Sequence, residues 1–182
     1  MLHEQEMEIV ELSIKKWATE EVFSFGWFLI VGIVITAYII WLKLVDRKRG
    51  TELLLIGSLD AVSKAIVIII LGNVLGLYHY NVRIFPITVN IFITSVTVSP
   101  IIIMLAQQYK SSWKGFMLWI AIGYAFMNFV IFPIYTLLGI VEFHKGWNVF
   151  YHFLVIYAVS LAVRIVFLWI TGTQKRLQEK AQ

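Results

Sequence analysis

Five apolar runs, each about as long as a bilayer is thick, constrain this chain more than any other feature. They cover residues 26–45, 53–77, 84–106, 116–140 and 149–171. A helix needs roughly 20 mainly apolar residues to cross about 30 Å of hydrocarbon. The composition agrees, because 60% of the 182 residues are hydrophobic and only 14% are charged, against about 25% charged in an average soluble domain. The sequence therefore predicts an integral membrane protein.

The apolar runs are continuous, without the dyad alternation that a transmembrane β-barrel requires. We therefore predict an all-α fold, a bundle of five transmembrane helices over residues 26–171. Residues 172–182 are expected to form a basic tail. In residues 1–25, Met7, Val10, Ile14 and Trp17 recur at three- and four-residue spacing, which predicts a short amphipathic helix outside the membrane.

The positions of Lys and Arg predict the orientation of this bundle. Cytoplasmic loops carry an excess of these residues, and nine of the fifteen fall on one side if the five helices simply alternate. The N-terminus is therefore predicted outside the membrane and the C-terminus in the cytoplasm. The nine residues are Lys43, Arg47, Lys48, Arg49, Lys110, Lys114, Lys175, Arg176 and Lys180.

Three charged residues lie inside the predicted spans, where charge is costly and marks either function or a packing device. Asp60 and Lys64 are one helical turn apart and share a face with Gly57 and Ala61, and small residues of this kind let helices approach closely. Arg164 lies at about the depth of Asp60, counting about 1.5 Å per residue. We predict a polar seam of Asp60, Lys64 and Arg164 between the second and fifth helices. It is either a packing device or a site for an ion or anionic solute.

A second polar group is predicted nearer the outer face, formed by Asn73, Asn90 and His152. These residues either line a shallow outward cavity or hydrogen-bond between helices. Enzyme and metal-site motifs are missing from the sequence, as are cysteines and histidine pairs at helical spacing, so neither a cofactor nor a metal is expected. The least implausible acid/base set is Glu142, His144 and His152.

The basic cluster Arg47, Lys48 and Arg49 follows the first span directly. Such juxtamembrane clusters set topology and attract anionic lipid headgroups. The net charge of +4 therefore serves orientation, and a nucleic-acid partner is not expected because the cations are not clustered on one folded surface. The lipid bilayer is the expected partner, and a second copy of the chain or another membrane protein is left open.

Aromatic, basic and proline residues along most of the chain form a recognisable pattern. They are Trp41, Lys43, Leu44, Val45, Asp46, Arg47, Lys48, Arg49, Glu52, Gln108, Tyr109, Trp113, Lys114 and Phe116, with Gly76, Tyr78, Tyr80, Pro86, Pro100, Pro133, Trp147 and Tyr151. This pattern resembles that of small uncharacterised multi-pass membrane proteins of endospore-forming bacteria, and the resemblance implies a bacterial cytoplasmic membrane. Relatives often carry acidic residues near the end of the second helix and early in the third, where this chain has Asn73 and the region of Thr94 and Ser95.

Three functions follow from these observations. The first is a non-enzymatic membrane protein with a structural, assembly or, from the resemblance, spore-associated role. The second is a small carrier or channel-like protein that uses Asp60, Lys64 and Arg164 for an ion or anionic solute. The third is a membrane enzyme that uses Glu142, His144 and His152. A dry, packed interior favours the first, a water-accessible cavity that reaches Lys64 favours the second, and an outward pocket that joins the two histidines favours the third.

Overall fold

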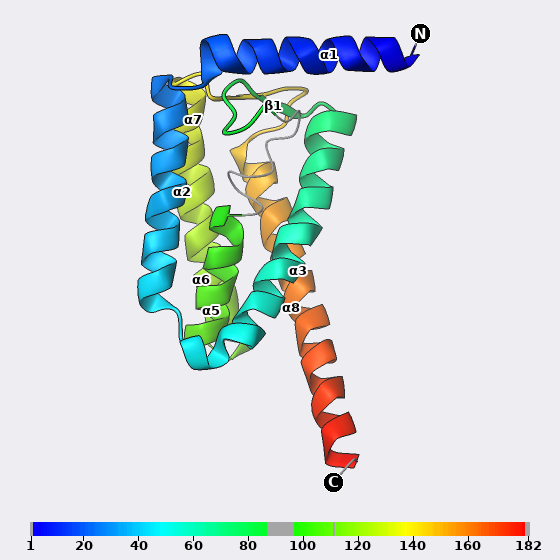
Figure 1. The fold of residues 1–182 in the computed structure, drawn as a ribbon. Helices are drawn as coiled ribbons and strands as arrows, with labels where there is room; N and C mark the ends of the chain where they lie inside the picture. Colours follow the sequence, from blue (N-terminus) through cyan, green and yellow to red (C-terminus); the bar gives the residue numbers. More distant parts are fainter. Residues whose placement is uncertain (1, 87–96, 111, 181–182) are drawn as a thin grey trace.

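The computed structural model describes residues 2–86, 97–110 and 112–180, which form a long helical bundle with one helix across its end (Figure 1). Four helices in these ranges are long and apolar enough to cross a membrane: Phe25–Leu44, Arg47–Val74, Trp113–Leu137 and Val149–Glu179. The prediction of a helical membrane protein is confirmed at this level. Four of the five predicted apolar runs correspond to these helices.

The bundle consists of α2 (Phe25–Leu44), α3 (Gly50–Ile68), α5 (Ser99–Tyr109), α6 (Trp113–Phe126), α7 (Phe132–Leu137) and α8 (Val149–Lys180). The 3₁₀ turn η2 (Arg47–Arg49) precedes α3, and the π-helical segments η3 (Ile69–Val74) and η5 (Met127–Ile131) continue α3 and α6. Side-chain caps begin two of the helices. The hydroxyl of Ser24 accepts from the backbone N–H of Trp27 at the start of α2, and that of Ser112 accepts from Gly115 at the start of α6, which satisfies helix donors that have no partner within the helix.

The third predicted span, residues 84–106, is described only in part. Residues 87–96, with Asn90, Thr94 and Ser95, lie outside the described residues. Residues 84–86 are not helical, whereas α5 begins at Ser99 and runs to Tyr109. Pro100 lies in the first turn of α5, where its missing N–H is not needed for the helix ladder.

Helix α1 (Leu2–Lys16) lies across one end of the bundle, at a steep angle to the other helices (Figure 1). The π-helical segment η1 (Trp17–Glu21) follows it. The carboxylate of Glu21 accepts two hydrogen bonds from the guanidinium of Arg83, at 2.6 and 3.0 Å, and one from the backbone N–H of Arg83. Arg83 Nη1 also donates to Ser13 Oγ at 2.6 Å. This buried ion pair attaches the end of α1 to the bundle.

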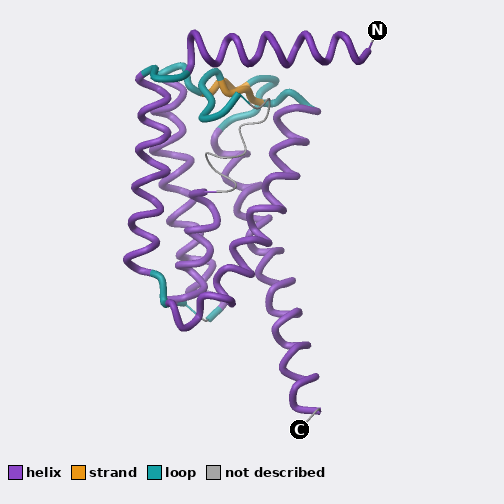
Figure 2. The backbone as a smooth tube through the Cα atoms, in the orientation of Figure 1, coloured by secondary structure: helices purple, strands orange, loops and turns teal. Residues whose placement is uncertain are grey.

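A two-stranded antiparallel sheet lies beneath α1, and Figure 2 shows its strands in orange. Strand β1 (Tyr78–Tyr80) pairs with β2 (Val141–Phe143), with His79 opposite Glu142. The chain enters β2 through Gly139, which has a positive φ of 66°. The N–H of Gly139 donates to the backbone carbonyl of Thr136, and the N–H of Ile140 donates to that of Tyr135. These are the two hydrogen bonds of a Schellman motif at a helix C-terminus. We call this end of the bundle the sheet end.

The opposite end, the basic end, holds η2, the link from α5 to α6 and the C-terminal part of α8 (Figure 1). Between the two ends the interior has two apolar clusters. The cluster towards the basic end includes Leu53, Ile103, Phe116 and Phe167, and the cluster at the sheet end includes Ile30, Ile68, Tyr78, Phe132 and Tyr135. Large apolar side chains also cover much of the outer surface of the long helices, as expected where a bundle faces lipid.

Candidate functional site: a buried charged network

Asp60 and Lys64 lie on α3, one turn apart, and both side chains are fully buried. Lys64 Nζ is 2.9 Å from Asp60 Oδ1 and 3.1 Å from Oδ2. A lysine and an aspartate at this spacing meet on one face of a helix. Because a lone buried charge would be costly, the pair explains how both residues can lie within the bundle.

Three hydroxyl groups from three other helices complete the surroundings of this pair. Ser99 on α5 donates to Asp60 Oδ2 at 2.7 Å, and Ser160 on α8 donates to Oδ1 at 2.8 Å. Lys64 Nζ donates to Ser99 Oγ, to Ser160 Oγ at 2.6 Å and to Tyr124 Oη of α6 at 2.6 Å. We call these five residues, Asp60, Lys64, Ser99, Tyr124 and Ser160, the charged network.

The hydrogen atoms of the charged network can all be assigned to acceptors. An ammonium group has three N–H donors, and the hydroxyls of Ser99, Tyr124 and Ser160 can accept one each. The two serine hydroxyls then donate to the two oxygens of Asp60, and Tyr124 Oη lies 2.7 Å from Ser160 Oγ, which can accept its proton. The ammonium also lies 4.1 Å from the centre of the Tyr124 ring, a favourable cation–π distance. The charged network is therefore fully satisfied without a ligand.

Close contacts between helices allow these short side chains to meet. A Cβ atom on Gly57 of α3 would lie 2.8 Å from the sulfur of Met104 on α5. A Cβ atom on Gly123 of α6 would lie 2.7 Å from Cγ2 of Ile102 on α5. Both distances are shorter than normal contacts, so the absence of a side chain at these glycines lets α5 pack closely against α3 and α6.

Arg164, the third residue of the predicted seam, is one turn beyond Ser160 on α8 and is also buried. Its guanidinium lies 4.0 Å from the ring centre of Phe116 and 4.8 Å from that of Trp113. Nη1 is 3.4 Å from the carbonyl oxygen of Ser112, before α6. The structure thus brings Asp60 and Lys64 together, and it places the guanidinium of Arg164 against the start of α6.

A cavity with a volume of about 530 Å³ lies beside Arg164 at the basic end. Arg49, Glu52 and Gln107 contribute to its wall. Arg49 and Glu52 form a two-pronged ion pair with N–O distances of 2.7 and 3.0 Å. Of the predicted basic cluster, Arg47 and Lys48 are exposed, whereas Arg49 is half-buried and also donates to the carbonyl oxygen of Gln108.

The second predicted polar group is not gathered in one place among its described members. Asn73 is exposed on η3, whereas His152 is buried on α8. His152 instead pairs with Asn128 of η5, with 2.7 Å between Nδ1 and Oδ1. Asn90 lies outside the described residues.

The predicted acid/base set is spread over two environments. Glu142 and His144 are exposed at the sheet end, and Glu142 accepts from the side chain of Asn81 at 2.7 Å. His152 is buried between the rings of Phe132 and Tyr78, at centroid distances of 4.8 and 5.7 Å. The three side chains therefore do not converge on one pocket. Within the described ranges, no group of three acidic or histidine residues could hold a metal ion.

Sequence reasoning missed Tyr124 as a member of the charged network, although a hydroxyl in the middle of an apolar run is itself a signal that a partner is needed. It also missed the Glu21–Arg83 pair. The comparisons with protein-family models, curated proteins and solved structures found no match for this chain.

Proposed function

We propose that this chain is a non-enzymatic, multi-pass protein of a bacterial cytoplasmic membrane with a structural or assembly role. The charged network carries this proposal, because all its donors can find acceptors within the protein. A site that binds and releases an ion or solute needs polar groups that exchange partners with the ligand. Here Asp60 and Lys64 are held by each other and by hydroxyls from three further helices, so their role is to hold four helices in one arrangement.

The proposal includes a membrane topology. Residues 84–106 supply a fifth span, the sheet end faces outwards, and α1 is an amphipathic helix on the outer surface. The excess of Lys and Arg at the basic end supports this orientation. The exposed Arg47 and Lys48 would then contact anionic headgroups of the inner leaflet. The resemblance to membrane proteins of endospore-forming bacteria supports a spore-associated role, with a second copy or another membrane protein as partner.

A second candidate function is a small carrier for an anionic solute. The cavity of about 530 Å³ at the basic end favours it, because Arg49, Glu52 and Arg164 line its wall. Gln107 Oε1 is buried there without a hydrogen-bond partner among the described residues. The cavity reaches Arg164 but does not include Asp60 or Lys64 in its wall, so a pathway through it would need to open the packed interior.

Flux measurements on the full chain in liposomes separate the two functions. Vesicles loaded with chloride, phosphate or potassium are compared with protein-free vesicles, with and without a membrane potential. The structural role predicts the same efflux rates in both. A saturable flux that Arg164→Gln or Lys64→Met abolishes, in variants that keep the helix content of the unmodified chain, would overturn it in favour of the carrier.

A further inference from the structure

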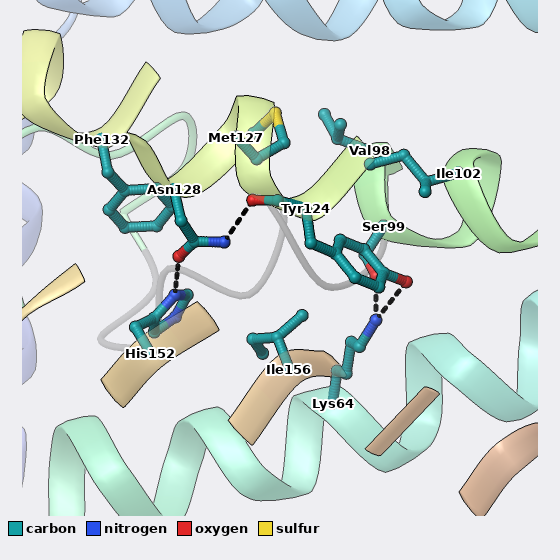
Figure 3. Close-up of a pocket in the computed structure, with 10 residues that line it drawn as sticks. All are labelled: Lys64, Val98, Ser99, Ile102, Tyr124, Met127, Asn128, Phe132, His152 and Ile156. Carbon is teal, nitrogen blue, oxygen red and sulfur yellow. Dashed lines mark hydrogen bonds between the residues drawn. The ribbon is translucent and has the colours of Figure 1, made fainter. Parts of the chain in front are cut away.

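A small cavity separates the charged network from the buried pair of His152 and Asn128. Its water-accessible volume is about 20 Å³, and on this scale about 10–15 Å³ is enough for one water molecule. Figure 3 shows its wall, in which Lys64, Ser99 and Tyr124 lie towards one end and Asn128 and His152 towards the other. The apolar part of the wall is formed by Val98, Ile102, Met127, Phe132 and Ile156.

The hydrogen bonds of Asn128 determine the tautomer of His152. Asn128 Nδ2 donates to the backbone carbonyl of Tyr124 at 2.8 Å, which turns Oδ1 towards His152 (Figure 3). Because an amide oxygen can only accept, His152 Nδ1 must carry the hydrogen of the 2.7 Å contact. In the neutral ring, Nε2 is then an acceptor. It is buried and has no partner among the described residues.

We propose that this cavity binds one water molecule, which donates a hydrogen bond to His152 Nε2 and joins the His152–Asn128 pair to the charged network. A buried acceptor without a donor carries a desolvation penalty, and the hydrogen bond from the water removes it. The second hydrogen of the water can be accepted by the hydroxyl oxygen of Ser99 or Tyr124, because both residues line the cavity and each hydroxyl has two acceptor lone pairs. Together with His152 Nε2, this acceptor gives the water two polar partners, and a buried water typically has two to four.

The charge around the cavity selects water over a cation. Lys64 contributes to the wall, and a second positive charge beside its ammonium would be repelled in a medium of low dielectric constant. An anion would not donate to Nε2. A neutral molecule that both donates and accepts is therefore favoured, and the volume leaves room for only one water.

Solid-state NMR of the full, ¹⁵N-labelled chain in lipid bilayers tests the proposal. His152 is expected to show a protonated Nδ1 and an unprotonated, hydrogen-bonded Nε2, with magnetisation transfer from water to the ring. The signals are assigned by their loss in His152→Phe. A protonated Nε2, or an unprotonated Nε2 that receives no transfer from water, would overturn the proposal.

A cavity-filling variant locates the water. Val98→Ile adds one methyl group to the cavity wall and leaves every polar group in place, so transfer from water to His152 should be lost. The matched control is Val163→Ile, because Val163 is also a buried valine of the bundle but does not line the cavity. Transfer should persist in the control. If transfer from water to His152 is as strong in Val98→Ile as in the unmodified chain, the water lies elsewhere and the proposal is wrong.

Discussion

The ammonium of Lys64 lies 2.9 Å from the carboxylate of Asp60, one turn away on α3, and hydroxyls from α5, α6 and α8 enclose both groups. An ion pair inside a membrane protein is stable only if each charge finds compensation there. Because the compensating hydroxyls come from three other helices, the pair connects four helices. Loss of any one member should therefore destabilise the whole bundle.

The hydroxyl of Tyr124 offers the mildest test of this dependence. Tyr124→Phe removes one acceptor of Lys64 and keeps the aromatic ring, so it should lower the free energy of unfolding by about 1–3 kcal/mol. Unfolding of the purified chain in detergent, followed by circular dichroism, measures this loss. Tyr135→Phe is a matched control, because the Tyr135 hydroxyl is also buried but has no hydrogen-bond partner among the described residues. Equal losses in both variants would contradict the importance of the Tyr124 hydroxyl.

Gly123 tests the close packing of α5 against α6. In Gly123→Ala the new methyl group would lie 2.7 Å from Cγ2 of Ile102, and a β-branched side chain has few other rotamers. We expect a loss of about 1–3 kcal/mol from overpacking, measured in the same unfolding assay. Gly32→Ala on α2 should cost nothing by this mechanism, since no atom lies within 4 Å of its new Cβ. A Gly123→Ala variant as stable as Gly32→Ala would contradict the packing.

The ion pair of Glu21 with Arg83 should control how firmly α1 is attached. Arg83→Leu removes the guanidinium donors to both Glu21 and Ser13 and leaves only the backbone N–H of residue 83 for Glu21, so hydrogen exchange in α1 and η1 should become faster while α3 and α8 stay protected. Glu20→Gln is the control, because Glu20 is next to Glu21 in the chain but is exposed. Unchanged exchange in Arg83→Leu would show that other contacts attach α1.

His79 on β1 should titrate below the ordinary histidine value. Partial burial lowers the pKa of His79, the charges of Lys16 and Arg83 and the proximity of His144 lower it further, and Glu142 opposes them. Because the unfolded chain then binds this proton at a higher pH than the folded chain, folding stability should fall as the pH drops below about 6.5. NMR titration should show a higher pKa for His79 in Lys16→Gln. The exposed Lys15→Gln is the control, and an unchanged pKa in Lys16→Gln would contradict the role of that charge.

The sequence predicted the four long apolar helices and the pairing of Asp60 with Lys64, because helix length and spacing along one helix are local properties. It could not place Arg164, whose depth resembles that of Asp60 but whose guanidinium contacts depend on how α8 packs against α6. Tyr124 is 60 residues from Lys64, and Glu21 is 62 from Arg83. Neither contact follows from a periodic pattern. The three-residue strands β1 and β2 are likewise too short to produce a clear alternation of polar and apolar residues.

A double-mutant cycle on Asp60 and Lys64 tests the central claim most directly. Asp60→Asn leaves the ammonium without its counter-ion, and Lys64→Met leaves the carboxylate without one, so each single variant should lose about 3–5 kcal/mol of stability. In the double variant neither charge is buried alone. The free energy of unfolding is measured in detergent for all three variants. We expect the double variant to lose less of it than the sum of the two single losses, with a difference of more than about 1 kcal/mol. Additive losses, or single variants as stable as the unmodified chain, would contradict the claim.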